Sequence, residues 1–86
     1  MNDLISVIVP AYNAEAFIER CLNSLLRQTY ENLEIICIND GSTDESPEIL
    51  SRYADRDPRI RIISRTNGGL YAARHAGLKI ARGKYI

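Results

Sequence analysis

The sequence contains no apolar run long enough to cross a lipid bilayer. Its longest apolar stretches, Val7 to Val9 and Ile35 to Ile38, have the length of buried strands, whereas a membrane-spanning helix needs about 20 apolar residues. The first residues, Met1-Asn2-Asp3, lack the basic start of a signal peptide. We therefore expect a cytoplasmic protein, and peripheral association with the inner face of the membrane is compatible with that location.

Cysteine and histidine are scarce. Cys21 and Cys37 are the two cysteines, and neither lies in a Cys-x-x-Cys pair or near a set of histidines, which argues against a zinc or redox site. Both have apolar neighbours in the sequence, so we expect reduced thiols in the core. His75 is the single histidine, and we do not expect it to be catalytic.

Low-complexity segments and internal repeats are also absent. The chain is 45% hydrophobic and 26% charged, values typical of soluble globular domains, so disorder is excluded. Its 86 residues allow one small domain over residues 1–86.

Acidic residues are missing from the last third of the chain. All 11 acidic residues lie at or before Asp57. This segregation predicts a positive face for a phosphate-bearing ligand or an anionic surface. The alternative is that the balancing acidic residues lie in sequence outside this chain, and the pattern leaves both interpretations open. The basic residues from Pro58 onward are Arg59, Arg61, Arg65, Arg74, Lys79, Arg82 and Lys84.

Strands and helices are predicted to alternate along the first half. Leu4 to Pro10 is rich in β-branched residues and nearly all apolar, which predicts a strand covered on both faces. A helix is expected over residues 14–28, with Asn13 as its N-cap. Leu33 to Asn39 is a second buried strand, which ends at the turn Asp40-Gly41-Ser42. The helix's expected buried stripe is Phe17, Ile18, Cys21, Leu22, Leu25 and Leu26.

The alternation continues in the second half. A helix is expected from Ser46-Pro47 to Asp57-Pro58. Ile60 to Ser64 is a third strand, and its alternating arginine and apolar residues predict a sheet edge. A third helix runs from Leu70 to Arg82, with Gly83 as a left-handed cap before a fourth strand over residues 84–86. This order predicts an α/β fold with a three-layer, Rossmann-like parallel sheet.

Polar residues follow each predicted strand at its carboxyl end. Tyr12 and Asn13 follow the first strand, Asp40 the second, and Asn67-Gly68 the third. Parallel strands bring these ends to one rim, where ligands of open α/β sheets bind. A tyrosine ring stacks on a nucleobase, and a carboxylate accepts hydrogen bonds from the N–H edge of the base. The rim is therefore predicted to bind a nucleotide.

Three motifs in this order resemble the opening of the family 2 glycosyltransferases. They are Ser6 to Asn13, then Ile38 to Asp44, then Asn67 to Gly69 with Ala73-Arg74 and residues 83–86. The resemblance covers nearly the whole chain and implies a truncated GT-A fold that holds the nucleotide-sugar-binding half. It implies hexosyl transfer with inversion from a nucleotide-diphosphate sugar, most often a UDP-sugar, to a sugar or glycolipid acceptor in polysaccharide biosynthesis, with no nucleic acid as partner.

The resemblance also implies roles for individual residues. In the family, the position of Tyr12 lies against uracil, that of Asp40 hydrogen-bonds the uracil, and that of Arg74 is an arginine near the nucleotide. Asn39 departs from many members, which carry another polar or acidic residue there. The nucleotide-binding residues implied are Pro10, Ala11, Tyr12, Asn13, Asp40, Gly41, Ser42 and Arg74.

Each role has a structural alternative. Tyr12 could pack on the first helix, Asp40 could serve the turn, and Arg74 could pair with Glu15. For Asp44 we expect a turn or capping role. His75 lies one position beyond Arg74 and is expected to point elsewhere.

The family's catalytic elements are not present in these residues. Just after the segment matching residues 84–86, family members carry an Asp-x-Asp-like element that holds a divalent cation, Mg or Mn, and later a general base. We therefore expect no catalytic or metal-binding residue in this chain and no activity from it alone. We also expect the first strand to lack its neighbour, and the exposed sheet edge to cause self-association.

Two other classes of protein remain open. One is a non-catalytic nucleotide- or phosphate-binding module, although the chain lacks Gly-x-Gly-x-x-Gly and a Walker lysine motif. The other is a receiver-like or structural interaction domain, which needs an acidic cluster where Tyr12-Asn13 stands.

Overall fold

The computed structural model describes residues 3–27 and 31–85. Strands and helices alternate through these residues as the sequence predicts, and the predicted bounds lie within two residues of the observed ones. Gln28 and Ile86, the predicted ends of the first helix and the fourth strand, lie outside the described residues. The elements are β1 (Ile5–Ala11), α1 (Glu15–Leu26), β2 (Leu33–Asp40), α2 (Ser46–Arg56), β3 (Ile60–Arg65), α3 (Leu70–Ile80) and β4 (Lys84–Tyr85).

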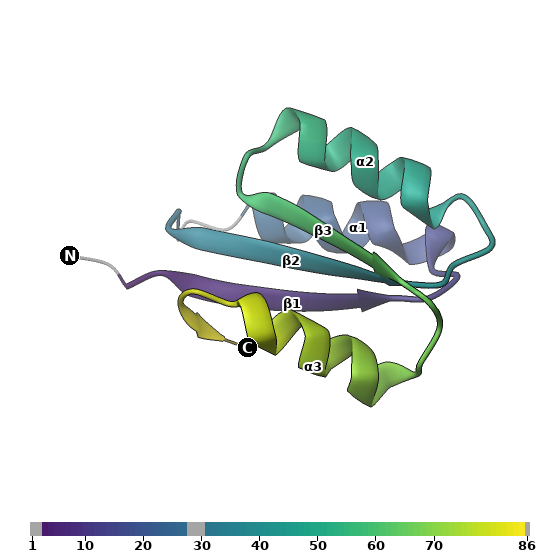
Figure 1. Ribbon diagram of the computed structural model, residues 1–86. Coiled ribbons are helices and arrows are strands. Elements are labelled where there is room, and N and C mark those ends of the chain that lie inside the picture. The colour runs from purple at the N-terminus through teal and green to yellow at the C-terminus, as the bar shows by residue number, and fades with distance from the viewer. Residues whose placement is uncertain (1–2, 28–30, 86) are drawn as a thin grey trace.

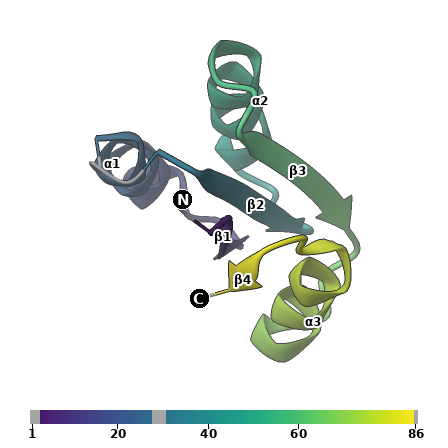
Figure 2. The same cartoon turned by 90° about the vertical axis from the view of Figure 1, so that its left-hand side faces the viewer.

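The strands form one parallel sheet in the order β3-β2-β1-β4. The prediction that the third strand lies at an edge is confirmed. The expectation that the first strand lacks its neighbour is wrong, because β4 pairs with β1 at Ile5↔Lys84 and Ser6↔Tyr85. Figure 2 shows this short strand beside β1.

The helices lie on both faces of the sheet. Figures 1 and 2 show α1 and α2 on one face and α3 on the other, which confirms the three-layer prediction. Within the described residues, no helix has the length and apolar character that crossing a bilayer requires.

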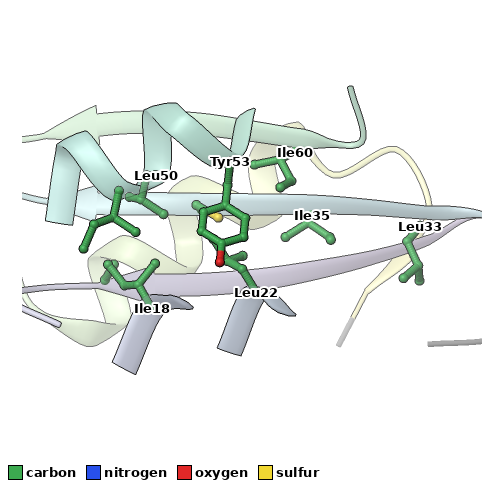
Figure 3. Close-up of a cluster of buried hydrophobic side chains, with 10 residues drawn as sticks. Ile18, Leu22, Leu33, Ile35, Leu50, Tyr53 and Ile60 are labelled. Carbon is green, nitrogen blue, oxygen red and sulfur yellow. The ribbon is translucent and has the colours of Figure 1, made fainter. Parts of the chain in front are cut away.

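The larger part of the core lies between the sheet and the helices α1 and α2 (Figure 3). Side chains from three directions meet there: Ile18 and Leu22 from α1, Leu50 from α2 and Ile35 from β2. The hydroxyl of Tyr53, on α2, donates a hydrogen bond to Asn23 Oδ1 of α1 at 2.7 Å, so the buried tyrosine has a partner for its polar atom. A smaller cluster on the α3 face contains Ile36, Ile38 and Ala73, with Ile8, Ile63, Ile80 and Ala81 packed against it.

The buried stripe of α1 is narrower than predicted. Ile18 and Leu22 are buried, but Phe17 is 65% exposed and Cys21 is also exposed, so the prediction that both lie in the core is wrong. Phe17 and Cys21 line a shallow hollow beside Val9 and Pro10 of β1. Cys37 is buried as predicted, and burial, with a smaller effect of the nearby Cys21, raises the pKa of its thiol to about 12.

The charges that are segregated along the sequence are paired in the fold. Four of the basic residues after Pro58 form ion pairs with acidic residues that precede it. Arg74 and Lys79 of α3 remain exposed. Much of the predicted positive charge is therefore neutralised inside the domain. The pairs are Arg59–Asp57, Arg61–Glu34, Arg65–Asp40 and Arg82–Glu34.

A candidate nucleotide pocket at the carboxyl ends of the strands

A pocket of about 390 Å³ lies where β1, β2 and β3 end. In Figure 1 this is the end of the sheet to which the arrowheads of the three strands point. Its volume falls within the range of small-molecule sites, roughly 300–1,000 Å³. The prediction that the polar residues after the strands share one rim agrees with this position. The lining residues are Pro10, Ala11, Tyr12, Asp40, Asn67, Gly69 and Ala73.

Tyr12 and Asp40 line the same pocket but differ in exposure. Tyr12 is 53% exposed, which is too much for a ring packed against α1. Asp40, the last residue of β2, is 3% exposed. The pocket therefore offers an aromatic face that is open to solvent beside a carboxylate that is held in the fold.

The carboxylate of Asp40 is oriented by the loop between β3 and α3. Its Oδ1 accepts a hydrogen bond from Gly68 N at 3.0 Å, and its Oδ2 accepts one from Gly69 N at 3.0 Å. Arg65 Nε lies 3.3 Å from Oδ1. Two carboxylate oxygens have about four acceptor sites. Asp40 thus keeps capacity for a further donor from a ligand.

The loop between β1 and α1 is tied to the loop between β2 and α2. Asn13 Oδ1 accepts a hydrogen bond from Thr43 N at 2.8 Å, and Asn13 N donates one to Ser42 Oγ at 3.1 Å. Asn13 has a φ of 48°, a left-handed conformation that asparagine tolerates better than most residues. The prediction that Asn13 caps α1 is wrong, because its side chain is used in this contact between loops.

The N-terminus of α1 is capped by residues about 30 positions away. Ala14 N donates to Ser46 Oγ at 3.0 Å, and Glu15 N donates to Asp44 Oδ2 at 3.2 Å. Asp44 Oδ1 also accepts from Ser46 N at 2.9 Å. Desolvation opposes ionisation of Asp44, but these hydrogen bonds outweigh it, so its pKa lies below its ordinary value. This agrees with the predicted capping role of Asp44.

Of the remaining predicted site residues, Gly41 and Ser42 lie in the loop after β2, and Arg74 lies on α3. Gly41 and Ser42 lie behind the pocket wall: Ser42 Oγ donates to Ala11 O at 3.3 Å, and Ser42 N donates to Asn39 Oδ1 at 3.1 Å. Arg74 is an exposed residue of α3. It makes no ion pair with Glu15 within the described part of the chain, and it follows the pocket-lining Ala73.

Asn67 was not among the predicted nucleotide-binding residues, yet it lines the pocket. Its Nδ2 donates to Asp40 O at 3.1 Å. Gly41 has a φ of 73°, and a Cβ there would lie 2.6 Å from Asn67 N, so the two loops pass each other with no space for a side chain. The signal available in the sequence is the Asn67-Gly68-Gly69 turn directly after β3.

The described residues do not supply a metal site. Residues 3–27 and 31–85 contain no group of three or more His, Cys, Asp or Glu side chains placed to hold a metal ion.

Comparisons with known proteins agree with this architecture. A sequence of 58% identity over all 86 residues is the uncharacterized glycosyltransferase EpsJ of Bacillus subtilis, and the match covers 25% of that protein. The chondroitin synthase of Pasteurella multocida is 43% identical over 83 residues, covering 96% of this chain and 9% of the synthase. The chain thus spans at most about a quarter of the length of these relatives.

Solved structures match with similar coverage. The mannosyltransferase PcManGT of Pyrobaculum calidifontis, in complex with GDP-Man and Mn2+, superposes with a TM-score of 0.88 at 30% identity, over 96% of this chain and 26% of that one. Residues 1–349 of TarS from S. aureus, in complex with UDP-GlcNAc, superpose with a TM-score of 0.87 at 33% identity, with the same coverage.

The family profile described as "Glycosyl transferase family 2" matches residues 6–86. The matched span includes β1 from Ser6 onward, the whole of β2, the loops at the pocket and the turn into β4. On this match and on the relatives above, the chain belongs to glycosyl transferase family 2.

Proposed function

We propose that these residues form the nucleotide-recognising part of a glycosyltransferase that uses a nucleotide-diphosphate sugar. The observation that carries the proposal is the position of Tyr12 and Asp40 on one pocket at the carboxyl ends of the strands. Membership of the family supports the class of reaction.

A pyrimidine base fits the two groups that the pocket presents. The open face of Tyr12 stacks on the base, an interaction worth about 1–3 kcal/mol per base. Asp40 accepts the imide N–H of uracil with its remaining lone pairs, and a hydrogen bond to a charged group contributes about 1.5–3 kcal/mol. Because Gly68 and Gly69 already hold this carboxylate, little ordering is needed when the base binds.

Arg74 is the proposed contact to the rest of the nucleotide. It carries an exposed positive charge on α3, directly after a residue of the pocket wall. Its side chain is long enough to reach a ligand that extends out of the pocket. Asn13, Gly41 and Ser42 then act by holding the two loops that shape the wall, as their hydrogen bonds and close contacts indicate.

The donor base is proposed to be uracil, although the structural neighbours include complexes with both UDP-GlcNAc and GDP-Man. A carboxylate also accepts from the N–H edge of guanine, so the comparison of UDP with GDP belongs in the experiment. Inverting transfer, a divalent cation held by ligands outside the described residues, a sugar or glycolipid acceptor and a place at the inner face of the membrane are further parts of the proposal. Self-association through the sheet edge stays a prediction.

Calorimetric titration with UDP tests the proposal. Asp40→Asn removes the charge at nearly constant volume, and we expect it to weaken UDP binding about tenfold or more. Tyr12→Ala removes the stacking face, and we expect a loss of similar size. Asp55→Asn changes an exposed aspartate of α2 and is the matched control, with affinity unchanged.

Folding of each variant is checked by circular dichroism before titration. If folded wild-type protein does not bind UDP or GDP, the proposal is wrong. If it binds GDP more tightly than UDP, nucleotide recognition stands and the assignment of uracil is wrong.

A further inference from the structure

A second buried carboxylate lies at the opposite end of β2. Glu34 is 2% exposed and faces the same side of the sheet as Asp40. An isolated buried charge is strongly unfavourable, so it needs partners. Glu34 Oε1 accepts hydrogen bonds from Ser6 Oγ at 3.2 Å and from Arg82 N at 3.2 Å. Its Oε2 lies 2.6 Å from Arg82 Nε and 3.7 Å from Arg61.

These partners hold the turn between α3 and β4. The backbone N–H of Arg82 is bound by Glu34, and that of Gly83 donates to Ser6 Oγ at 3.0 Å. We call Ser6, Glu34, Arg82 and Gly83 the Glu34 latch. A Cβ at Gly83 would overlap the carbonyl oxygen of Leu4, so the turn lies directly against the start of β1. The prediction that Gly83 is a left-handed cap is wrong, since its φ is not positive. Glycine is required there for space.

The latch lies next to the pairing of β4 with β1. Within the described residues this pairing consists of two residue pairs. Ser6 is opposite Tyr85, and Ile5 is opposite Lys84. A strand usually has about five or six residues, so two pairs alone specify register weakly, and a slip of one residue would turn each side chain to the other face. The bonds from Arg82 and Gly83 fix the residues that enter β4.

The direction of β4 links the latch to the pocket. β4 is parallel to β1, and β1 ends at Pro10 and Ala11, which line the pocket. A chain that leaves β4 along the sheet therefore runs toward the pocket rim. Relatives such as EpsJ are about four times as long as the matched segment, so in proteins of that length the register of β4 affects what reaches the rim.

We infer that Glu34 is a positioning residue: through Ser6 and Arg82 it sets the register of β4 on β1 and thereby directs the chain after β4 toward the nucleotide pocket. The effect on register is independent of what the pocket binds. The consequence for sugar transfer rests on the proposed function.

Amide hydrogen exchange on the protein at its natural length tests the inference. Glu34→Gln keeps the size of the side chain but removes the charge, and we expect exchange at the amides of Arg82 and Gly83 to accelerate about tenfold or more. The amides in the middle of β2 exchange through global unfolding. Once the fall in global stability measured by denaturation is divided out, we expect them to stay within about twofold of wild type, while Arg82 and Gly83 keep their excess acceleration because the latch acts locally. Glu48→Gln, on an exposed glutamate of α2, is the matched control and leaves both regions unchanged.

A double-mutant cycle asks whether the latch acts as one unit. Ser6→Ala removes the acceptor of Gly83 N and is also the second variant if Glu34→Gln does not fold. We expect Ser6→Ala with Glu34→Gln to accelerate exchange at Gly83 no more than about twofold beyond the larger single effect, because coupled sites are not additive. Independent, multiplicative effects would contradict a single latch.

UDP affinity separates this inference from the proposed function. We expect Glu34→Gln to bind UDP within about twofold of wild type, since Glu34 lies at the far end of the sheet from the pocket. Unchanged exchange at Arg82 and Gly83, or equal acceleration throughout the sheet, overturns the inference. If wild-type protein does not bind UDP but the latch amides respond as expected, the proposed function fails and the positioning role stands.

Discussion

The two ends of β2 use the same arrangement for different purposes. Each end has a buried acidic residue that faces α3, Asp40 or Glu34, and each accepts hydrogen bonds from backbone N–H groups beside that helix. Each is also paired with an arginine of β3, Arg65 or Arg61. Asp40 lines a pocket, whereas Glu34 is enclosed by its partners. One carboxylate has acceptor capacity for a ligand, and the other is committed to the fold.

The glycines beside α3 show the same difference. Gly69 has a φ of 90° and nothing within 4 Å of a Cβ built on it, whereas a Cβ at Gly83 would overlap the backbone at Leu4. The Asp40 end needs glycine for its conformation, and the Glu34 end needs it for close packing. The first requirement leaves open space at the pocket, and the second leaves none.

The largest effect is expected from Gly83→Ala. Its Cβ meets the backbone carbonyl of Leu4, directly before β1, which cannot rotate away, so we expect the free energy of unfolding to fall by about 3 kcal/mol or more. Urea denaturation measures the change. An unchanged midpoint would show that the turn before β4 is loosely held, and the contrast between the two ends would then be wrong.

The variants Glu34→Gln and Asp40→Asn compare the two ends of β2 directly, because each replaces a buried carboxylate by an amide of the same size. Each variant removes a buried charge that several donors share, and we expect each to lower the free energy of unfolding by about 2 kcal/mol. The expected difference is in binding: Asp40→Asn also weakens UDP binding, and Glu34→Gln does not. Denaturation and calorimetry on both proteins check this, and equal effects on UDP affinity would remove the distinction.

A smaller effect is expected from Gly69→Ala. The backbone of Gly69, with φ 90° and ψ 172°, lies in a region that other residues rarely adopt, so strain of about 1–2 kcal/mol is expected even though space is available. The same denaturation series measures it. If Gly69→Ala lowered stability as much as Gly83→Ala, glycine would not be needed for different reasons at the two positions.

The smallest expected effect is the loss of stability that protonation of Glu34 causes in acid. Burial opposes ionisation of Glu34, but its bonds to Arg82 and Ser6 outweigh it and hold its pKa below the ordinary value. The unfolded chain therefore takes up the proton first. The contribution of Glu34 is present above the ordinary glutamate pKa, about 4.3, and is lost as the pH falls through the lower folded value.

Stability against pH, compared for wild type and Glu34→Gln, measures this contribution. Asp44 and Asp57 also have lowered pKa values, so both proteins lose stability in acid. We expect the wild-type slope to be steeper by less than about 1.4 kcal/mol per pH unit, the limit for one proton. Parallel curves would show that Glu34 is not held as the geometry indicates.

The order of elements and the shared rim could be predicted from the sequence, because both depend on local patterns. Apolar β-branched runs predict parallel strands, and parallel strands bring Tyr12 and Asp40 to one edge without any knowledge of packing. The turn at Asn67 also follows from its local sequence. Arg74 was placed by resemblance, and its contact with a nucleotide stays a prediction.

The features that were missed depend on residues far apart in the chain. The cap of α1 comes from Asp44 and Ser46, and nothing in the sequence near Asn13 distinguishes a distant cap from a local one. The exposure of Cys21 depends on how α1 packs on the sheet, which its local apolar pattern does not reveal. The partners of Glu34 are up to 48 positions away, so the sequence of β2 alone does not reveal why a glutamate is buried there.

An NMR titration of the labelled protein with UDP reports on both ends of α3 at once, and so tests whether the nucleotide binds at the Asp40 end and not at the Glu34 end. We expect the amide signals of Gly68 and Gly69 to shift as UDP saturates the pocket, while those of Arg82 and Gly83 do not. Shifts confined to Arg82 and Gly83, or no shift at any of the four amides in folded protein, would contradict this expectation.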